Sequence, residues 1–305
     1  MKSKKGNLGS QPDQQPSLVI CDWGSSHLRT YLVDAEGSTL RRYESNRGVK
    51  SNAGNKSIYR EELNKALEKL QVSTDSEIRI SGMAGSKLGW EETDYSPTPV
   101  TKEEFASNYL PLSDFVNARL YGGVKHQNKD GSLDVMRGEE VQIFGIIAAN
   151  PDARLICLPG THSKWVTVEN GKIMAFKTYM TGDLFHSLCE ESIFKGQITS
   201  RTFNRDGFLH GCRLATEGND LQDLFKLRSE YVFSKISSEA FHSCLSGFLI
   251  MNELKSANPQ SKVSLCGSPS LIPLYAVALE EIGIQNLALD SETATISGHQ
   301  SLISL

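Results

Sequence analysis

The sequence predicts an α/β protein with two lobes, each opened by the same arrangement of strands. Residues 17–44 and 153–183 each contain the pattern of three antiparallel strands, and in both segments a short turn rich in hydrogen-bond donors follows the first strand. Strand and helix patterns alternate through the rest of the chain. A length of 305 residues favours two domains over one.

The first of these segments begins with the apolar run "VICDW" and continues through a Gly-Ser-Ser turn into an alternating run and the strand-like "STLRRYES". Residues 57–71 predict a helix, because their apolar side chains recur on one face. The short run "EIRIS" predicts a buried strand that leads into "GMAGSKLGW". Residues 91–135 are rich in Pro, Gly and polar residues, and their pattern is the weakest in the chain.

The second segment follows "RGEEVQIFGIIAAN", which predicts a helix with two acids in its first turn, where the helix dipole favours them. The strand "ARLICL" then leads through the turn "PGTHS" to a strand at 164–168, and Asn170-Gly171 is a strong hairpin signal. Further helices are expected at 181–194, 219–233 and 238–257. The chain closes with the strand "KVSLCG", the helix "SPSLIPLYAVALEEIG", the strand "NLALD" and a last helix.

Composition excludes several classes of protein. A net charge of −4 without a basic run beyond the first residues argues against nucleic acid as a partner. No apolar stretch approaches the ~18–20 residues of a membrane helix. The six cysteines are scattered without disulfide or zinc spacing, so we expect a reducing, cytoplasmic location. Residues 1–16 predict a disordered tail.

The turn after the first strand raises a question of charge, because Asp22 directly precedes Gly24, Ser25 and Ser26. Successive amide and hydroxyl donors in such a turn form a concave site for anionic oxygens. An acid beside an anion site is repelled unless a divalent cation lies between the two. The alternative is an ordinary β-hairpin with a polar loop.

Several longer motifs together resemble the 2-dehydro-3-deoxygalactonokinases of the actin, hexokinase and heat-shock ATPase (ASKHA) superfamily. They are "DWGSSHLRTYL", "SGMAGSKLGW", "MRGEEVQIFG", "LPGTHSKWV", "MTGDLFHSL" and the weaker "LSGFLI". The resemblance covers the chain from about Val19 onward. It implies a duplicated, ribonuclease H-like fold whose lobes each contain a mixed sheet flanked by helices. It places residues 17–151 in a lobe with the first hairpin and the sugar-acid contacts. Residues 152–305 then form a lobe with the second hairpin and the adenosine site, and nucleotide binds in the cleft between the lobes.

The resemblance implies phosphorylation of the 6-hydroxyl of 2-dehydro-3-deoxy-D-galactonate with ATP and Mg²⁺. Asp22 would hold the metal ion, largely through water. The nucleotide-binding residues would be Gly24, Ser25, Ser26, Gly160, Thr161, His162, Lys164, Gly267 and Ser268, the last two under adenine. Lys164 has an alternative interpretation as a solvated strand lysine.

A carboxylate at the start of a helix would accept the proton of the attacking hydroxyl, which makes Glu139 and Glu140 the catalytic candidates. Adjacent helical residues point about 100° apart, so only one can face the substrate, and we favour Glu139. The alternative is that both acids only complement the helix dipole. The candidate substrate-binding residues are Arg29, Ser86, Lys87, Trp90, Arg137 and Asp183. Arg29 and Arg137 are the candidates for binding the substrate carboxylate, although Trp90 can equally be a core residue and Asp183 a helix cap.

Two positions depart from the family pattern, namely Asp183, where Glu is expected, and His299 in a final helix that is usually more apolar. Other catalytic classes lack their motifs, because the chain contains no GxSxG, no GxxxxGK[ST] and no HExxH. Two alternative functions remain open: a kinase for another 2-keto-3-deoxy sugar acid, and a non-catalytic nucleotide sensor with the same fold. A homodimer is also left open.

Overall fold

The computed structural model describes residues 18–52, 55–218 and 220–302. The chain divides into two compact units: Met1–Thr93 with Tyr109–Tyr121, and Asp94–Asn108 with Gly122–Leu305. The disordered tail predicted for residues 1–16 lies outside the described residues. These units do not follow the predicted lobe boundary at residue 151, which stays a prediction. No helix of the described residues is long and apolar enough to cross a membrane.

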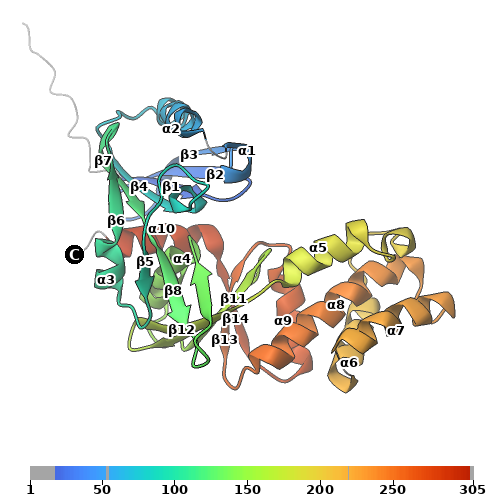
Figure 1. Cartoon of the computed structure of the whole chain (residues 1–305). Helices are drawn as coiled ribbons and strands as arrows, with labels where there is room; N and C mark the ends of the chain where they lie inside the picture. Colours follow the sequence, from blue (N-terminus) through green and yellow to red (C-terminus); the bar gives the residue numbers. More distant parts are fainter. Residues whose placement is uncertain (1–17, 53–54, 219, 303–305) are drawn as a thin grey trace, which may run out of the picture. The chain divides into compact units, whose positions relative to one another are not determined.

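The first unit is built on a six-stranded sheet in the order β3-β2-β1-β4-β7-β6 (Figure 1). Strand β1 runs antiparallel to β2 and parallel to β4. One face of the sheet packs on helix α2, whose apolar residues Leu63, Leu67 and Leu70 are buried. The elements are β1 (Leu18–Trp23), β2 (Leu28–Val33), β3 (Thr39–Ser45), α1 (Val49–Asn52), α2 (Lys56–Leu70), β4 (Glu77–Gly82), η1 (Met83–Gly85), β6 (Tyr109–Leu112) and β7 (Phe115–Tyr121).

The second unit contains a five-stranded sheet in the order β12-β11-β10-β13-β14. Strand β10 runs antiparallel to β11 and parallel to β13, which repeats the pairing of β1 with β2 and β4. The predicted duplication is therefore confirmed at the level of sheet topology. The strands are β10 (Leu155–Leu158), β11 (Ser163–Glu169), β12 (Lys172–Tyr179), β13 (Val263–Gly267) and β14 (Asn286–Asp290).

A smaller sheet, β5-β8-β9, accounts for part of the segment that had little sequence pattern. Its strands are β5 (Tyr95–Pro97), β8 (Gly123–Gln127) and β9 (Leu133–Met136), with α3 (Lys102–Ser107) between β5 and β6. Strand β9 leads into helix α4 (Glu139–Ala149), the helix predicted from "RGEEVQIFGIIAAN".

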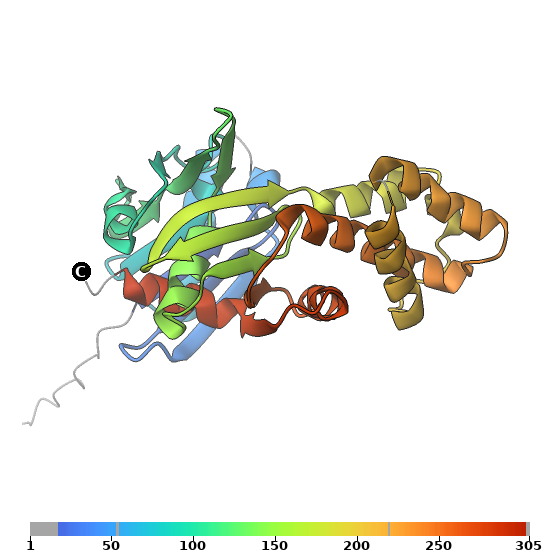
Figure 2. The ribbon, with the colours of Figure 1, turned by 90° about the horizontal axis from the view of Figure 1, so that it is seen from below.

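The remaining helices of the second unit are α5 (Thr181–Glu191), η2 (Lys195–Gln197), α6 (Arg205–Glu217), α7 (Asp220–Val232), α8 (Ser238–Ala257), α9 (Ile272–Glu281) and α10 (Ser291–Ser301). Figure 2 shows α5 to α8, in yellow to orange, grouped beside one end of the five-stranded sheet. Their apolar faces and α9 share one core with Cys157, Trp165 and Leu265 of that sheet. The sequence pattern predicts α5, α7, α8, α9 and α10 but not α6.

Helices α4 and α10 pack closely because glycines lie where they meet. A Cβ atom added to Gly145 would come within 2.0 Å of the Ala294 carbonyl oxygen, and one added to Gly298 within 1.9 Å of the Val141 carbonyl oxygen. Each glycine therefore admits the backbone of the opposite helix. This contact fixes α4, and with it the two acids at its start.

We expect Gly298→Ala to lower the free energy of unfolding by about 1–3 kcal/mol, because the added methyl group meets a backbone atom that cannot move alone. The matched control is Gly196→Ala, since a Cβ at Gly196 meets nothing within 4 Å. Chemical denaturation of both variants measures the difference. Equal stability of the two variants would contradict the close α4–α10 contact.

Candidate active site

The turn between β1 and β2 is anchored through its carbonyl groups. The backbone N–H groups of residues 48–50 donate to the carbonyls of Ser26, Gly24 and Ser25 at 2.9–3.1 Å. A Cβ at Gly48 would lie 2.3 Å from the Ser26 carbonyl carbon, so only glycine permits this approach. The Gly24 N–H donates to the His27 carbonyl at 2.9 Å, so the turn offers the amide and hydroxyl groups of Ser25 and Ser26 to an anion. The sequence pattern predicts the turn, whereas the role of Gly48 emerges only from the structure.

Asp22 lies at the end of β1, opposite Arg29 on β2. The Arg29 guanidinium lies 3.5 Å from an Asp22 carboxylate oxygen and 3.5 Å from a Glu44 carboxylate oxygen. About a quarter of the Asp22 side chain is exposed, and half of the Arg29 side chain. Asp22 therefore has a carboxylate that a hydrated cation can reach, and Arg29 has a guanidinium that a carboxylate ligand can reach.

The loop that follows β4 separates the three residues predicted there. Trp90 is 3% exposed and packs among Trp23, Tyr59 and Phe115, with ring centroids 5.9–6.0 Å away. The structure therefore gives Trp90 the core position that the sequence left as the alternative. Lys87 is exposed, whereas the Ser86 hydroxyl is buried without a hydrogen-bond partner in the described residues. A buried hydroxyl of this kind is a group that a bound ligand or water can satisfy.

The second donor-rich turn, Gly160–Ser163, is closed by the start of helix α5. The Asp183 N–H donates to the Thr161 carbonyl at 3.0 Å, and a Cβ at Gly182 would lie 2.4 Å from the Gly160 carbonyl oxygen. The residue that caps α5 is Met180, so Asp183 lies in the first turn and is not the cap residue. The "MTGD" motif thus places the positive end of a helix dipole against the turn.

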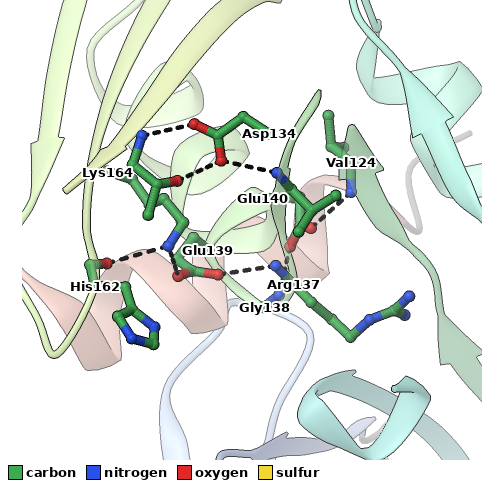
Figure 3. Close-up of polar contacts among 10 residues, drawn as sticks. Val124, Asp134, Arg137, Gly138, Glu139, Glu140, His162 and Lys164 are labelled. Carbon is green, nitrogen blue, oxygen red and sulfur yellow. Dashed lines mark hydrogen bonds and ion pairs between the residues drawn. The ribbon is translucent and has the colours of Figure 1, made fainter. Parts of the chain in front are cut away.

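Lys164 joins this turn to the start of helix α4. Its Nζ donates to the His162 carbonyl at 3.1 Å and lies 3.3 Å from a Glu139 carboxylate oxygen, while the other Glu139 oxygen accepts the Arg137 N–H at 3.0 Å (Figure 3). The Lys164 side chain is 5% exposed and that of Glu139 is 28% exposed. Lys164 is therefore not a solvated strand lysine. It is a buried cation whose counter-charge is a partly accessible carboxylate.

Glu140 has a different environment, as the 100° rotation between adjacent helical residues requires. It is fully buried, and its two oxygens accept the backbone N–H groups of Val124 at 3.0 Å and Gly138 at 2.5 Å. Burial, followed by the charge of Glu139, raises the pKa of Glu140 from its usual 4.5 to about 8. Glu140 thus fixes the start of α4 against β8, including Gly138 at φ +106°.

Arg137 is also buried, with 8% of the residue exposed. Its guanidinium carbon lies 4.3 Å from the ring centroid of Tyr95, and its Nε is 3.4 Å from the Tyr95 hydroxyl. This stacking places the cation on the aromatic face. Of the two predicted arginines, Arg29 is therefore the more accessible.

A cavity of about 410 Å³ opens beside the second turn, entirely within the second unit. Gly160 and the first residues of α5 form one side, and Ser270 and Leu271, directly before α9, form another. Gly267 and Ser268 come shortly before these residues, and a Cβ at Gly267 would lie 3.0 Å from the Pro159 carbonyl oxygen. The sequence pattern does not reveal the aromatic part of the wall, which includes Phe185, Phe203, His242 and Tyr275.

The ring of His242 meets that of Phe185 edge to face, with centroids 5.0 Å apart. Burial, and then the charge of Arg201, lowers the pKa of His242. The wall therefore presents an imidazole and apolar rings, together with Arg201, which is paired with Glu190. The rings suit the flat face of a base, and Arg201 adds a positive charge to the cavity wall.

The described residues contain no group of three or more His, Cys, Asp or Glu side chains that could enclose a metal ion. Mg²⁺ does not need such a group, because it is commonly bound by one or two carboxylates, water and substrate phosphates. The hard oxygen ligands of Asp22 fit that mode.

Comparison with known proteins decides the family. The family model of 2-keto-3-deoxy-galactonokinase matches residues 22–302. The chain belongs to this family. The 2-dehydro-3-deoxygalactonokinase of Escherichia coli (strain K12) is 29% identical over 296 residues, which cover 93% of the chain and 96% of the relative. A candidate 2-dehydro-3-deoxygalactonokinase of Rhizobium meliloti (strain 1021) is 30% identical over 91% of the chain and 93% of the relative.

Solved structures agree with the family assignment. The crystal structure of a candidate 2-dehydro-3-deoxygalactonokinase from Sinorhizobium meliloti is 29% identical in sequence and superposes with a TM-score of 0.83. The match covers 94% of this chain and 97% of the Sinorhizobium meliloti chain. An activator of 2-hydroxyisocaproyl-CoA dehydratase from Clostridium difficile, solved with ADPNP, matches 94% of each chain with a TM-score of 0.51 at 11% identity, which shows the fold alone. The predicted ASKHA fold class is confirmed.

The pKa of Glu140 predicts a pH-dependent stability. Because the folded state favours the protonated carboxyl, folding takes up a proton between pH 4.5 and about 8. The stabilisation is therefore complete below this range and is lost as the pH rises through it. Glu140→Gln loses one of the two acceptor oxygens, so at low pH it is less stable than the wild type. Because it has no carboxyl group to ionise, its stability does not fall further as the pH rises through this range.

We expect the difference in melting temperature between the wild type and Glu140→Gln to narrow as the pH rises from about 5 to about 8. The control is Glu169→Gln at an exposed position, whose melting temperature should follow that of the wild type. Thermal unfolding across this pH range measures both differences. A constant difference for Glu140→Gln would contradict the raised pKa.

Proposed function

We propose that this protein is a carbohydrate kinase that transfers the γ-phosphoryl group of ATP to the 6-hydroxyl of 2-dehydro-3-deoxy-D-galactonate. The observation that carries the proposal is the family match over residues 22–302. The contact of Glu139 with Lys164 beside a donor-rich turn supports it, because it places a partly exposed carboxylate next to groups that bind phosphate. The alternatives, another sugar acid or a non-catalytic sensor, are not favoured.

Phosphoryl transfer depends mainly on positioning and charge stabilisation, with one group to accept the proton of the attacking hydroxyl. Glu139 is the proposed base, since it is the member of the acidic pair with an accessible side chain. Glu140, which accepts two backbone N–H groups in a buried position, supports the start of the helix on which Glu139 lies.

The proposed nucleotide site uses both turns. Backbone and hydroxyl donors of Gly160, Thr161 and His162, and those of Ser25 and Ser26, would receive phosphate oxygens, with Gly24 shaping the first turn through its N–H to the His27 carbonyl. The cavity beside the second turn would receive the adenosine, with Gly267 and Ser268 at its edge and the neutral His242 in its wall. Lys164 contributes a positive charge behind the second turn.

Asp22 is the proposed Mg²⁺ ligand, acting largely through bound water. When bound, the ion supplies positive charge to the phosphate oxygens of the nucleotide. The Arg29 guanidinium beside Asp22 limits how much negative charge this carboxylate presents in the absence of the ion.

For the sugar acid, Arg29 is the proposed partner of the substrate carboxylate, because half of its side chain is accessible and a guanidinium can bind a carboxylate through two hydrogen bonds. Arg137, Ser86, Lys87 and Asp183 are further proposed contacts. A cytoplasmic location, the absence of nucleic-acid and membrane partners, and a homodimer remain predictions.

The proposed function is tested by a coupled assay of ADP release with ATP, Mg²⁺ and a panel of 2-keto-3-deoxy sugar acids. Of this panel, 2-dehydro-3-deoxy-D-galactonate should have the highest kcat/KM. Nuclear magnetic resonance of the product should show the phosphate on its 6-oxygen. Folded protein that binds ATP but phosphorylates none of the panel would refute the proposal.

We expect Glu139→Gln to lower kcat by ~10²–10⁴-fold and to leave the affinity for ATP nearly unchanged, because the amide keeps the size of the side chain but cannot accept a proton. Glu280→Gln, at an exposed position of α9, is the control and should keep wild-type kinetics. Steady-state kinetics and calorimetric ATP titration measure the two effects. Normal turnover in Glu139→Gln would move the base elsewhere, with Asp183 the next residue to test.

We expect Asp22→Asn to raise the Mg²⁺ concentration needed for half-maximal activity roughly tenfold or more, because the variant lacks the charge that holds the ion. Glu44→Gln is the matched control, since Glu44 is the other carboxylate 3.5 Å from Arg29. A Mg²⁺ titration of turnover separates the two. The same shift in both variants would show that the effect comes through Arg29 and not through the metal ion.

A further inference from the structure

A buried carboxyl group lies directly behind the second turn. Glu253 of helix α8 is 3% exposed. Its Oε1 accepts the indole N–H of Trp165 at 2.8 Å, and its Oε2 accepts the hydroxyl of Tyr275 at 2.8 Å. The hydroxyl of Ser163 lies 2.9 Å from that of Tyr275 and so joins the same cluster. Trp165 and Tyr275 can each donate, so Glu253 is their common acceptor in a polar cluster of the core.

The donors come from the elements that form the proposed nucleotide site. Trp165 and Ser163 lie on β11, and Ser163, the first residue of this strand, is also the last residue of the second turn. Tyr275 lies on α9 and lines the cavity. Glu253 itself is not among the lining residues. The carboxyl therefore connects the strand at the end of the turn with α9, from one layer behind the cavity.

The direction of these hydrogen bonds is fixed by counting protons. Tyr275 has one hydroxyl proton and donates it to Glu253. In the 2.9 Å contact between the Ser163 and Tyr275 hydroxyls, Ser163 must then be the donor, so its single proton goes to Tyr275. Ser163 is fully buried, and this hydrogen bond ties it to α9. This fixes the orientation of the residue that ends the turn.

The polar cluster around Glu253 is an unfavourable way to stabilise a core if its role is only structural. Burial of a carboxyl group destabilises the fold unless its oxygens are well hydrogen-bonded, and packed apolar side chains of similar volume often do as well or better in a core. In this unit the surrounding core is apolar, with Phe241, Phe248 and Leu265 among its members. A buried acid with donors from two site-forming elements, β11 and α9, thus points to a requirement for precise placement.

We propose that Glu253 is a positioning residue for phosphoryl transfer, which through Tyr275 and Ser163 fixes the phosphate-binding turn relative to the start of α9. This inference rests on the proposed function, since it assigns the turn to the nucleotide. It predicts that breaking the chain of hydrogen bonds affects the use of ATP and not the binding of the sugar acid.

The test is a double-mutant cycle of Tyr275→Phe and Ser163→Ala. Each single variant should lower kcat/KM for ATP about tenfold, the usual scale for one lost hydrogen bond in a positioned site, with an unchanged KM for the sugar acid. Because both side chains act through one chain of hydrogen bonds, kcat/KM for ATP in the double variant should be no lower than in the less active single variant. If the two fold-losses in kcat/KM multiply in the double variant, Tyr275 and Ser163 act separately, and the proposal is overturned.

Tyr43→Phe is the matched control, because it removes a hydrogen bond of the same kind, from the Tyr43 hydroxyl to Glu62 at 2.8 Å, in the first unit. It should lower the melting temperature and leave kcat/KM for ATP unchanged. A loss of kcat/KM in Tyr43→Phe equal to that in Tyr275→Phe would show a general effect of reduced stability, and would overturn the proposal.

Glu253→Gln gives a second test that does not depend on the serine variant folding. Its amide oxygen can still accept from Trp165, but its NH₂ group must donate to Tyr275, so that Tyr275 donates to Ser163 and the chain reverses. We expect kcat/KM for ATP to fall about tenfold. A Glu253→Gln enzyme with wild-type ATP kinetics would overturn the proposal.

Calorimetric titration with a non-hydrolysable ATP analogue separates this inference from the proposed function. A wild type that binds the analogue but phosphorylates no sugar acid refutes the function alone. The inference is then decided by binding, because Tyr275→Phe, Ser163→Ala and Glu253→Gln should each weaken the analogue about tenfold and Tyr43→Phe should not. Equal affinity in all four variants would overturn it.

Discussion

The ion pair between Lys164 and Glu139 is the interaction on which the site in the second unit depends. A buried ammonium group is costly unless a counter-charge and hydrogen-bond acceptors surround it. Glu139 and the His162 carbonyl supply them, so the start of α4 and the second turn are held together. The neighbouring contacts serve the same placement, because Glu140 fixes the first turn of α4 on β8 and the glycines of α4 and α10 fix the helix itself.

The two halves of the duplication share their strand order but stabilise their turns by different means. The first turn is held by its own carbonyls, which accept N–H groups from residues 48–50. The second is held by the start of α5, where Gly182 allows close approach, and by the buried side chains of Lys164 and Ser163. Backbone anchoring keeps a turn's shape whatever its side chains are. Side-chain anchoring links the second turn to distant helices.

Local signals in the sequence were sufficient for much of the fold. Asn170 and Gly171 adopt positive φ angles of 48° and 75°, as the predicted hairpin turn requires, and α2 spans Lys56–Leu70 where a helix was expected at 57–71. Helix α6 escaped prediction because Gly207 and Gly211 weaken its helical signal. Gly211 is needed for packing, since a Cβ there would lie 2.0 Å from the Cys244 carbonyl oxygen. The burial of Lys164 and the convergence on Glu253 depend on residues far apart in sequence, which periodicity and spacing do not reveal.

The central claim is that the second turn and the start of α5 bind the nucleotide as one preorganised element. Hydrogen exchange of backbone amides, followed with and without a non-hydrolysable ATP analogue and Mg²⁺, tests it most directly. The account predicts that peptides covering residues 159–164 and 180–185 gain protection together at the same nucleotide concentration. Saturating nucleotide that protects other segments and leaves both of these unchanged would contradict it.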